Sequence, residues 1–425
     1  MKLNLLAAAV AVALGSVSSS TWAFNLGLDP ECAFNGDYVG TVSTPEGTRH
    51  QCNLPADIVN PSPSDTTVTL PASHTYNSVT RAILWVMPTV VTVGNGHQAG
   101  RTPSTAAATV LQINAGARLA GGIANSALVI TRGARLNALG TATNPIVFSS
   151  LDSNYTGRGE WGGVILSSWD NTNNCNTGGE CTMEGISQGQ FFYGGYVNES
   201  TTASWDNISS GTVRFVAIAE GGHAVNVDID GDPDPNSNTG DEINGLTLYG
   251  VSSETNLSNV HIHNNFDDGI EFFGGDVDID NLWVTCATDD SVDWDFGYNG
   301  LLNNVYILQQ DGADHAFELA NNPTNFTASP VANASVSNVT LAFTDASPNV
   351  DTPFDLKEGS GGVFTNIEIG SAYTANCSSA GVASANSYNN IEYSCVNNRG
   401  HLPASTPQAG FTNSTFWTAY PGTCN

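Results

Sequence analysis

A short phrase that recurs along the chain constrains its fold more than any other feature of the sequence. The phrase is a polar residue, an Asn and then an apolar–x–apolar triplet, as in Ser258-Asn259-Val260-His261-Ile262. Seven copies occur, and their asparagines are Asn259, Asn281, Asn304, Asn338, Asn366, Asn390 and Asn413. The successive separations are 22, 23, 34, 28, 24 and 23 residues. This period indicates a solenoid with one coil for each copy and loop insertions in the longer intervals.

The phrase also predicts how each coil is built. Alternate residues of a strand face opposite sides, so Val260 and Ile262 are expected to enter the core while His261 faces outward. An Asn at the same turn of every coil can adopt left-handed backbone geometry and hydrogen-bond to its neighbours above and below. Leucine-rich repeats have similar ladders, but their regular leucine spacing is absent here. We therefore predict an all-β chain that forms a single right-handed parallel β-helix.

The two ends of the chain predict export and two caps. Residues 1–23 contain one Lys, an apolar run and the ending Thr21-Trp22-Ala23, with small residues at its first and last positions, which is the pattern of a signal peptide. The apolar run is too short to span a membrane. Residues 24–80 are expected to cap the first coil, 81–400 to form the β-helix and 401–425 to cap the last coil. These features predict a secreted or cell-surface protein.

Eight cysteines suit an oxidising compartment. Short separations favour three disulfides, namely Cys32–Cys52, Cys175–Cys181 and Cys377–Cys395. Cys286 and Cys395 occupy the same strand position four coils apart, about 19 Å, which is too far for a disulfide. Cys286 is therefore expected to be a buried free thiol unless a loop brings Cys424 to it.

The charge of the chain excludes some partners. Lys and Arg total 11 against 40 Asp and Glu, which gives a formal net charge of -29. This excess repels nucleic acids and anionic membrane surfaces, and no basic patch offsets it. The excess favours divalent cations, or simply solubility in a salty medium.

Acidic residues recur at matching positions of successive coils. The segments 268–273, 290–295 and 314–319 can be laid over one another, and 353–357 follows them. With the large apolar residues inward, one predicted outward row holds Glu271, Asp293 and Asp355 and is broken by Ala316. The other predicted row holds Phe273, Asp295, Glu318 and Lys357. The third segment contains an extra residue, so its register is defined only to within one position.

Carboxylates on neighbouring coils are expected to lie about 4.8 Å apart. Like charges at that spacing raise one another's pKa unless a cation or a proton intervenes. Calcium held between coils by carboxylate oxygens is one interpretation. A saccharide groove is the other: carboxyls one coil apart suit a retaining glycosidase, and carboxyls two coils apart, about 9.6 Å, suit an inverting one. The candidate catalytic residues are Asp293, Asp295 and Lys357, and the candidate ligand-binding residues are Glu271, Asp293, Asp295, Glu318, Trp283 and Tyr306.

Other groups of residues are weaker candidates. The acidic loop Asp228, Asp230, Asp232 and Asp234 resembles a calcium loop, but its Gly is at the fourth position and no Glu completes an EF-hand. A weak calcium site and a flexible acidic loop both remain open there. His261 and His263 could ligate a metal. Trp283 and Tyr306 occupy the His261 position on the next two coils, where they could stack on sugar rings or cover a loop. The turn acids, Asp267, Asp268, Asp289, Asp290, Asp311 and Asp314, are expected to be structural.

Four phrases resemble a known family. GEWGGVIL, EINGLTLYGV, DDGIEFFGGDVDIDNL and DDSVDWDFGYNG are similar to secreted bacterial right-handed β-helix proteins of the pectate-lyase-like superfamily. The resemblance implies the fold, and pectate-lyase-like enzymes pair acidic calcium ligands with an Arg or Lys base. Here no Arg lies between Arg214 and Arg399, so Lys357 is the only basic candidate on the acidic coils. We expect a protein that binds calcium and an extracellular polysaccharide or cell-surface glycan, or serves in adhesion. The alternative is a polysaccharide lyase or glycoside hydrolase.

Overall fold

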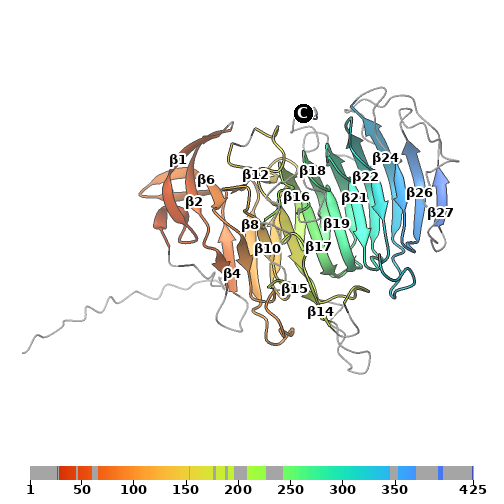
Figure 1. The fold of residues 1–425 in the computed structure, drawn as a ribbon. Helices are drawn as coiled ribbons and strands as arrows, with labels where there is room; N and C mark the ends of the chain where they lie inside the picture. Colours follow the sequence, from red (N-terminus) through yellow and green to blue (C-terminus); the bar gives the residue numbers. More distant parts are fainter. Residues whose placement is uncertain are drawn as a thin grey trace, which may run out of the picture.

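The computed structural model describes residues 26, 28–44, 46–59, 66–152, 154–175, 179–186, 190–195, 208–225, 243–344, 353–369, 391–395 and 424. Two long parallel sheets, which we name sheet A and sheet B, stack their strands along one axis in the order of the sequence (Figure 1). The chain is therefore a parallel β-helix, as the repeated phrase predicts. Among the helices of the described residues, none is long and apolar enough to cross a membrane.

Sheet B has nine strands. They are β3 (Asp57–Ile58), β7 (Val91–Val93), β10 (Leu128–Ile130), β13 (Val164–Ser167), β17 (Leu246–Val251), β19 (Ile270–Gly275), β21 (Val292–Asp295), β23 (Phe317–Leu319) and β25 (Phe354–Leu356). Apart from these sheets, β14 (Glu180–Thr182) and β15 (Phe192–Gly194) form an antiparallel hairpin.

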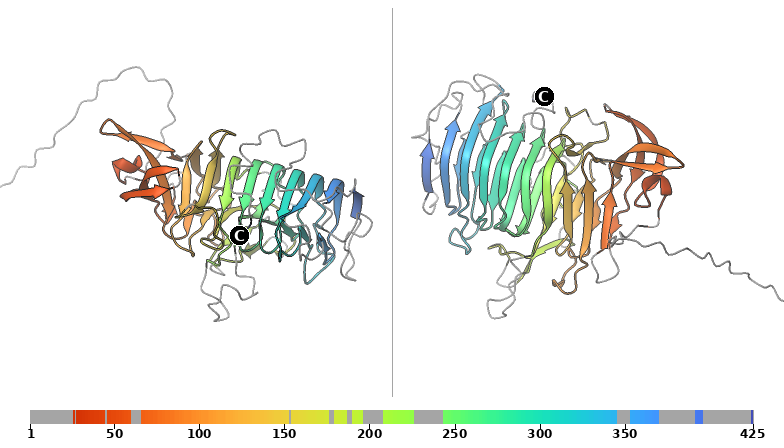
Figure 2. Two further views of the ribbon diagram at one scale, coloured as in Figure 1. Left: turned by 90° about the horizontal axis from the view of Figure 1, so that it is seen from above. Right: turned by 180° about the vertical axis from the view of Figure 1, so that it is seen from behind.

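Sheet A has sixteen strands, of which β1 and β5 pair antiparallel with β2 and β6. The first eight are β1 (Asp37–Thr44), β2 (Gly47–Asn53), β4 (Thr66–Leu70), β5 (Ser73–Tyr76), β6 (Val79–Met87), β8 (Thr109–Asn114), β9 (Arg118–Gly121) and β11 (Arg135–Leu139). The others are β12 (Ile146–Ser150), β16 (Gly211–Ala219), β18 (Asn256–His263), β20 (Ile279–Thr285), β22 (Leu301–Gln309), β24 (Ser335–Phe343), β26 (Gly362–Ile369) and β27 (Ile391–Cys395). Figure 2 shows these strands side by side from above and from behind.

A bend divides the long strands of sheet A from β16 to β26. The first half of β16 pairs with β11 and its second half with β12. β16 therefore runs along two faces of the solenoid and bends between them. The bend lies at a residue with positive φ, which on five later strands is an Asn: Asn259 (55°), Asn281 (63°), Asn304 (57°), Asn338 (58°) and Asn366 (57°). Asn tolerates this left-handed geometry better than most residues because its short side chain can hydrogen-bond locally.

The asparagines form the predicted ladder. Asn304 donates from Nδ2 to Oδ1 of Asn281 at 3.1 Å, and Asn366 donates to Asn338 at 2.7 Å. Asn338 instead donates to Oδ1 of Asn303, at 2.9 Å. The ladder is thus confirmed between Asn281 and Asn304 and between Asn338 and Asn366, with Asn303 taking the place of Asn304 as the acceptor for Asn338. No bond of this kind joins Asn259 to Asn281 in the described coils, and Asn390 and Asn413 lie outside the described residues.

The core fills the space between the sheets. Val260 and Ile262 lie in it, as the alternation predicts, together with Ile270 and Phe272 from sheet B. His261 is on the outer side of its strand but is also buried. The outer side of sheet A is therefore covered at this point, which the alternation alone could not reveal.

The parallel pairing begins early in the chain. β2 pairs with β6, β3 with β7 and β4 with β8, all in parallel, so parallel strands already occur within residues 24–80. Before them, a 3-10 turn, η1 (Pro30–Cys32), is attached to β2 by the Cys32–Cys52 disulfide. The predicted signal peptide, and the predicted C-terminal cap apart from Cys424, lie outside the described residues.

Two of the three predicted disulfides are confirmed, and one expectation is corrected. Cys32–Cys52 and Cys175–Cys181 are bonded. Cys286 is not a free thiol, because Cys424 reaches it across 138 residues of sequence. The predicted Cys377–Cys395 bond cannot be compared, because Cys377 lies outside the described residues.

Candidate functional site

One outward row of sheet B is acidic on four consecutive strands. Glu271 of β19 is the register partner of Asp293 of β21, Asp293 is the partner of Glu318 of β23, and Glu318 is the partner of Asp355 of β25. Each of these acids lies between two apolar residues that face the core, as Glu318 lies between Phe317 and Leu319. We name Glu271, Asp293, Glu318 and Asp355 the carboxylate row.

This register corrects the third coil of the sequence-based alignment. Glu318 was expected in the same row as Asp295, with Ala316 interrupting the carboxylate row. The pairing of Val292 with Phe317 instead moves Glu318 beside Asp293. The extra residue of this coil falls before β23, so His315, rather than Asp314, occupies the position equivalent to Asp290.

The second outward row is short. Phe273 and Asp295 are register partners, as predicted. Lys357 follows β25 directly and forms an ion pair with Glu318. The ammonium group therefore binds a member of the carboxylate row instead of extending a separate row.

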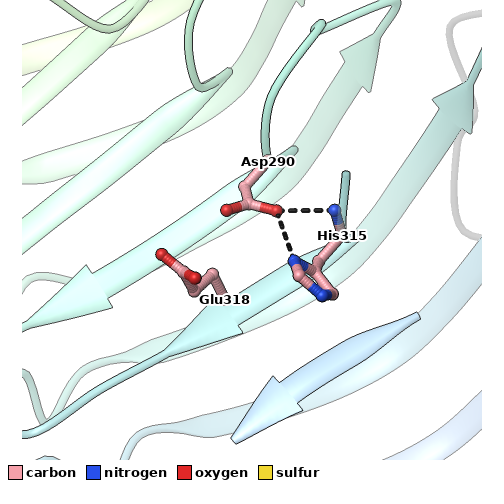
Figure 3. Close-up of side chains that lie close together, drawn as sticks. All are labelled: Asp290, His315 and Glu318. Carbon is pink, nitrogen blue, oxygen red and sulfur yellow. Dashed lines mark hydrogen bonds and ion pairs between the residues drawn. The ribbon is translucent and has the colours of Figure 1, made fainter. Parts of the chain in front are cut away.

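Two turn acids connect the coils and also approach the carboxylate row. Asp268 accepts the backbone N–H of Asp290 through Oδ1 at 2.9 Å. Asp290 in turn accepts the backbone N–H of His315 at 2.6 Å, and the same oxygen lies 3.1 Å from His315 Nδ1 (Figure 3). These bonds agree with the structural role expected of turn acids. They also bring both carboxylates into contact with the acids on the strands.

Among the groups of three potential metal ligands in the described part of the chain, two contain members of the carboxylate row. Cluster I consists of Asp268, Glu271 and Asp293, which offer ligand atoms that all lie within 4.8 Å of one another. Cluster II consists of Asp290, His315 and Glu318, and it satisfies the same limit. Asp268 precedes Glu271 by three positions in cluster I, and His315 precedes Glu318 by three positions in cluster II. The third member of cluster I, Asp293, comes from the next coil, whereas the third member of cluster II, Asp290, comes from the preceding coil.

Burial dominates the electrostatics of cluster I. Its three side chains are buried, and Asp293 is only 7% exposed. Burial raises the pKa of Asp268, Glu271 and Asp293 well above the usual range for carboxyls, and the neighbouring carboxylates raise it further. A cluster with these properties favours a bound cation or a retained proton.

Cluster II has positive groups of its own. Burial raises the pKa of Asp290 to about 7, although its bond to His315 opposes the shift. Burial disfavours the His315 imidazolium, but the bond to Asp290 and the negative charges of Asp290, Asp314 and Asp355 together outweigh that effect and raise the pKa of His315 to about 9. Burial likewise disfavours the Lys357 ammonium, and the contact with Glu318 nevertheless raises the pKa of Lys357.

The buried oxygens near cluster I that have no hydrogen-bond partner among the described residues include Asp293 Oδ1 and Asn244 Oδ1. The amide of Asn244 donates from Nδ2 to Glu271 Oε2 at 2.5 Å, which places Asn244 at the edge of cluster I. A buried oxygen without a partner costs about 1–3 kcal/mol, and more when it is charged. Asp295 Oδ1 is also buried without a partner, and burial raises the pKa of Asp295 to about 7.

The hairpin β14–β15 covers the outer face of sheet B before the carboxylate row begins. Tyr193 of β15 packs with Tyr249 of β17 and Phe273 of β19 in a second hydrophobic cluster. The rings of Tyr249 and Phe273 stack with centroids 4.3 Å apart. The cover reaches β19, which is the first strand of the carboxylate row. The aromatic side chains therefore border the acidic ones on the same sheet.

Trp283 and Tyr306 are not part of this site. They are register partners on sheet A, with ring centroids 4.4 Å apart. Both are buried, at 2% and 0% exposure, in a hydrophobic cluster that also contacts Cys424. Instead of the open stacking surface considered for sugar rings, the structure has covered rings, and contact with the C-terminal Cys424 is part of the reason.

His261 and His263 are also buried on sheet A. Their rings share one partner, Thr285 Oγ1, at 3.1 and 2.7 Å. Burial lowers the pKa of His261 well below its usual value and that of His263 to about 4. Both imidazoles are therefore neutral at ordinary pH, and no group of three candidate metal ligands in the described part of the chain includes either one. The acidic loop with Asp228, Asp230, Asp232 and Asp234 lies outside the described residues.

Sequence reasoning missed His315 and Asn244 and assigned Asp268 and Asp290 only to turns. A signal for the turn acids was present, because Asp268 and Glu271 have the same three-residue spacing as Asp290 and Asp293. Nothing comparable indicated Asn244, which reaches Glu271 from the preceding coil.

A family model described as a pectate-lyase-like beta helix domain matches residues 99–399. This match includes every residue of both clusters. Neither the curated proteins nor the solved structures contain a match to the chain.

Proposed function

The chain belongs to the family of the pectate-lyase-like β-helix domain, and on that basis we propose that it is an exported β-helix protein that binds calcium at cluster I. The surface beside this cluster would bind an extracellular polysaccharide or a cell-surface glycan, or serve in adhesion. The disulfides are compatible with an extracellular location, because such bonds persist in oxidising compartments.

A single observation carries the calcium proposal. Asp293 is almost completely buried between the other carboxylates of cluster I, and its Oδ1 has no partner among the described residues. None of the ion pairs in the described part of the chain includes a member of cluster I. Three buried carboxylates in contact require a compensating cation or protons, and a bound cation supplies the partner that Asp293 lacks.

The chemistry of the donors favours calcium over softer metals. Cluster I offers only carboxylate oxygens, and the nearby Asn244 Oδ1 is a neutral oxygen without a partner. Calcium accepts six to eight oxygen ligands in flexible geometry, including carboxylates and amide carbonyls, whereas zinc prefers nitrogen and sulfur. Waters or ligand hydroxyls could complete the shell.

Calorimetric titration of the full-length protein with calcium tests this proposal. We expect saturable binding that stabilises the protein against heat, and loss of both effects in Asp293→Asn. The matched control is Glu254→Gln, which removes the same charge at an exposed position. Equal calcium binding by the Asp293→Asn variant and the wild type would rule out cluster I as the site.

The glycan proposal rests on the family and on the position of the cluster. The carboxylate row begins where the aromatic cover of sheet B ends, so cation and glycan could meet at one surface. Purified protein is screened against uronate-containing and neutral polysaccharides with calcium and with a chelator. Binding that is unchanged by chelator and by Asp293→Asn would separate glycan recognition from cluster I.

One observation favours the alternative, a polysaccharide lyase or glycoside hydrolase. Burial raises the pKa of Asp295 to about 7, and the positive charge of Lys357 opposes that shift. A carboxyl that titrates near neutral pH beside an amine suits proton transfer. Under this alternative, polysaccharide incubation produces unsaturated uronates or new reducing ends, and Asp295→Asn abolishes them while Glu254→Gln does not.

A further inference from the structure

Both clusters draw on the same two positions of successive coils, but they differ in charge. Three successive coils place a turn residue two positions before the strand and an acid three positions after that residue. The pairs are Asp268 with Glu271, Asp290 with Asp293, and His315 with Glu318. On the third coil, an imidazole occupies the position that a carboxylate occupies on the other two.

The replacement changes what cluster II can bind. His315 Nδ1 lies 3.1 Å from Asp290 Oδ1 and 3.3 Å from Asp314 Oδ1, so the ring stands between two carboxylates. Lys357 forms an ion pair with the remaining acid, Glu318. The geometry alone would permit a metal ion in either cluster. In cluster II, however, each carboxylate already has a positive partner from the chain.

We propose that His315 and Lys357 are internal counter-ions that take the place of a metal ion in cluster II, so that the carboxylate row binds one divalent cation, at cluster I. This inference rests on the proposed calcium binding and assigns its stoichiometry and its position. Asp293 belongs to cluster I and is also the register partner of Glu318. Its unpartnered oxygen is therefore available to the cation of cluster I, while Glu318 is occupied by Lys357.

The arrangement has a physical reason. Neighbouring strands of a parallel sheet are about 4.8 Å apart, so each acid of the carboxylate row needs a positive charge close to it. The single positive charges of His315 and Lys357 neutralise the acids of cluster II without a divalent ion. They also need no ion from solution, so this part of the solenoid remains compensated when calcium is absent.

Calorimetric titration of the full-length protein with calcium provides the test. We expect one ion per wild-type chain. The double variant His315→Asp/Lys357→Met restores a cluster of three carboxylates without an ammonium, and we expect it to bind two ions. The control Arg135→Asp reverses one charge at an exposed position of β11 and is expected to bind one ion.

The outcomes distinguish this inference from the proposed function. Two ions in the wild type, or one ion in the double variant, would overturn the inference and leave calcium binding intact. No binding to the wild type would remove both.

A second variant keeps the test decisive if the double variant does not fold. Lys357→Met removes one counter-ion, and we expect calcium to raise its melting temperature more than that of the wild type. An equal or smaller increase would contradict the role of Lys357 as a substitute for the metal.

Discussion

One oxygen of Asp290, Oδ1, accepts the backbone N–H of His315 at 2.6 Å and lies 3.1 Å from the ring nitrogen Nδ1 of the same residue. The bond joins the second acidic coil to the third at a buried position. A charged imidazole strengthens the interaction with a charged carboxylate, whereas burial favours the protonated carboxyl, so the protonation of this pair is coupled to the folded state. The same coupling applies to the carboxylates of cluster I.

The first prediction concerns stability and pH. The pKa of Asp290 rises from 3.8 to about 7, and those of the cluster I acids rise well above their usual range. Between the unfolded and folded pKa values, the folded state binds more protons than the unfolded state. The free energy of unfolding therefore falls as pH rises through this window. We expect the melting temperature in chelator to fall from about pH 4 to about pH 7.

His315 extends this trend to higher pH. Its pKa is raised from 6.5 to about 9, so its contribution is fully present below 6.5 and is lost as pH rises through about 9. Thermal melts over a pH series, with calcium and with chelator, provide the measurement. Added calcium and the substitution Asp293→Asn should each reduce the fall of the melting temperature between about pH 4 and about pH 7. A melting temperature in chelator that rises between pH 4 and 7 would contradict the assignment.

The second prediction concerns Arg132, which attaches the β14–β15 hairpin to the solenoid. Its buried guanidinium donates to the carbonyls of Gly96 and Gly194 and to Glu180 Oε1 at 2.7, 2.9 and 2.8 Å. Arg132→Ala leaves these acceptors without a donor and should cost about 3–5 kcal/mol. Urea unfolding measures the loss, and limited proteolysis should cut the hairpin first. Arg135→Ala, three residues further on and exposed, should change stability by less than about 0.5 kcal/mol.

The third prediction separates the two roles of a ladder asparagine. Asn304 has a φ of 57° and donates a hydrogen bond to Asn281. Asn304→Ala loses the bond and strains the backbone, which should cost about 2 kcal/mol. Asn304→Gly loses the bond without that strain and should cost about 1 kcal/mol. If chemical unfolding finds the Gly variant less stable than the Ala variant, the backbone geometry is not what selects Asn here.

The fourth prediction compares two disulfides by the length of chain that each closes. Cys286 and Cys424 are separated by 138 residues, and Cys175 and Cys181 by 6. In the chain-entropy model the long loop contributes about 5 kcal/mol and the short loop about 2 kcal/mol. Replacement of each pair by serines should therefore lower the free energy of unfolding more for the long loop. Equal losses in urea unfolding would show that strain or residual structure outweighs loop entropy.

The amino-acid sequence by itself determined the coils, the ladder and the acidic strands. Strand alternation and turn geometry act over a few residues, so the repeated phrase was sufficient to orient Val260 and Ile262 inward and to predict left-handed geometry at Asn304. It was also sufficient to bring Glu271 beside Asp293, because the coil between them has the ordinary length.

Only the tertiary structure decided how the third coil aligns and what covers each face. The extra residue before β23 moved Glu318 beside Asp293 and brought His315 to Asp290, which depends on how an insertion is accommodated. Burial of Trp283 and Tyr306, and the bond from Cys286 to Cys424, depend on segments remote in sequence. Local periodicity contains no information about such contacts, because they are set by which distant parts of the chain pack against a strand.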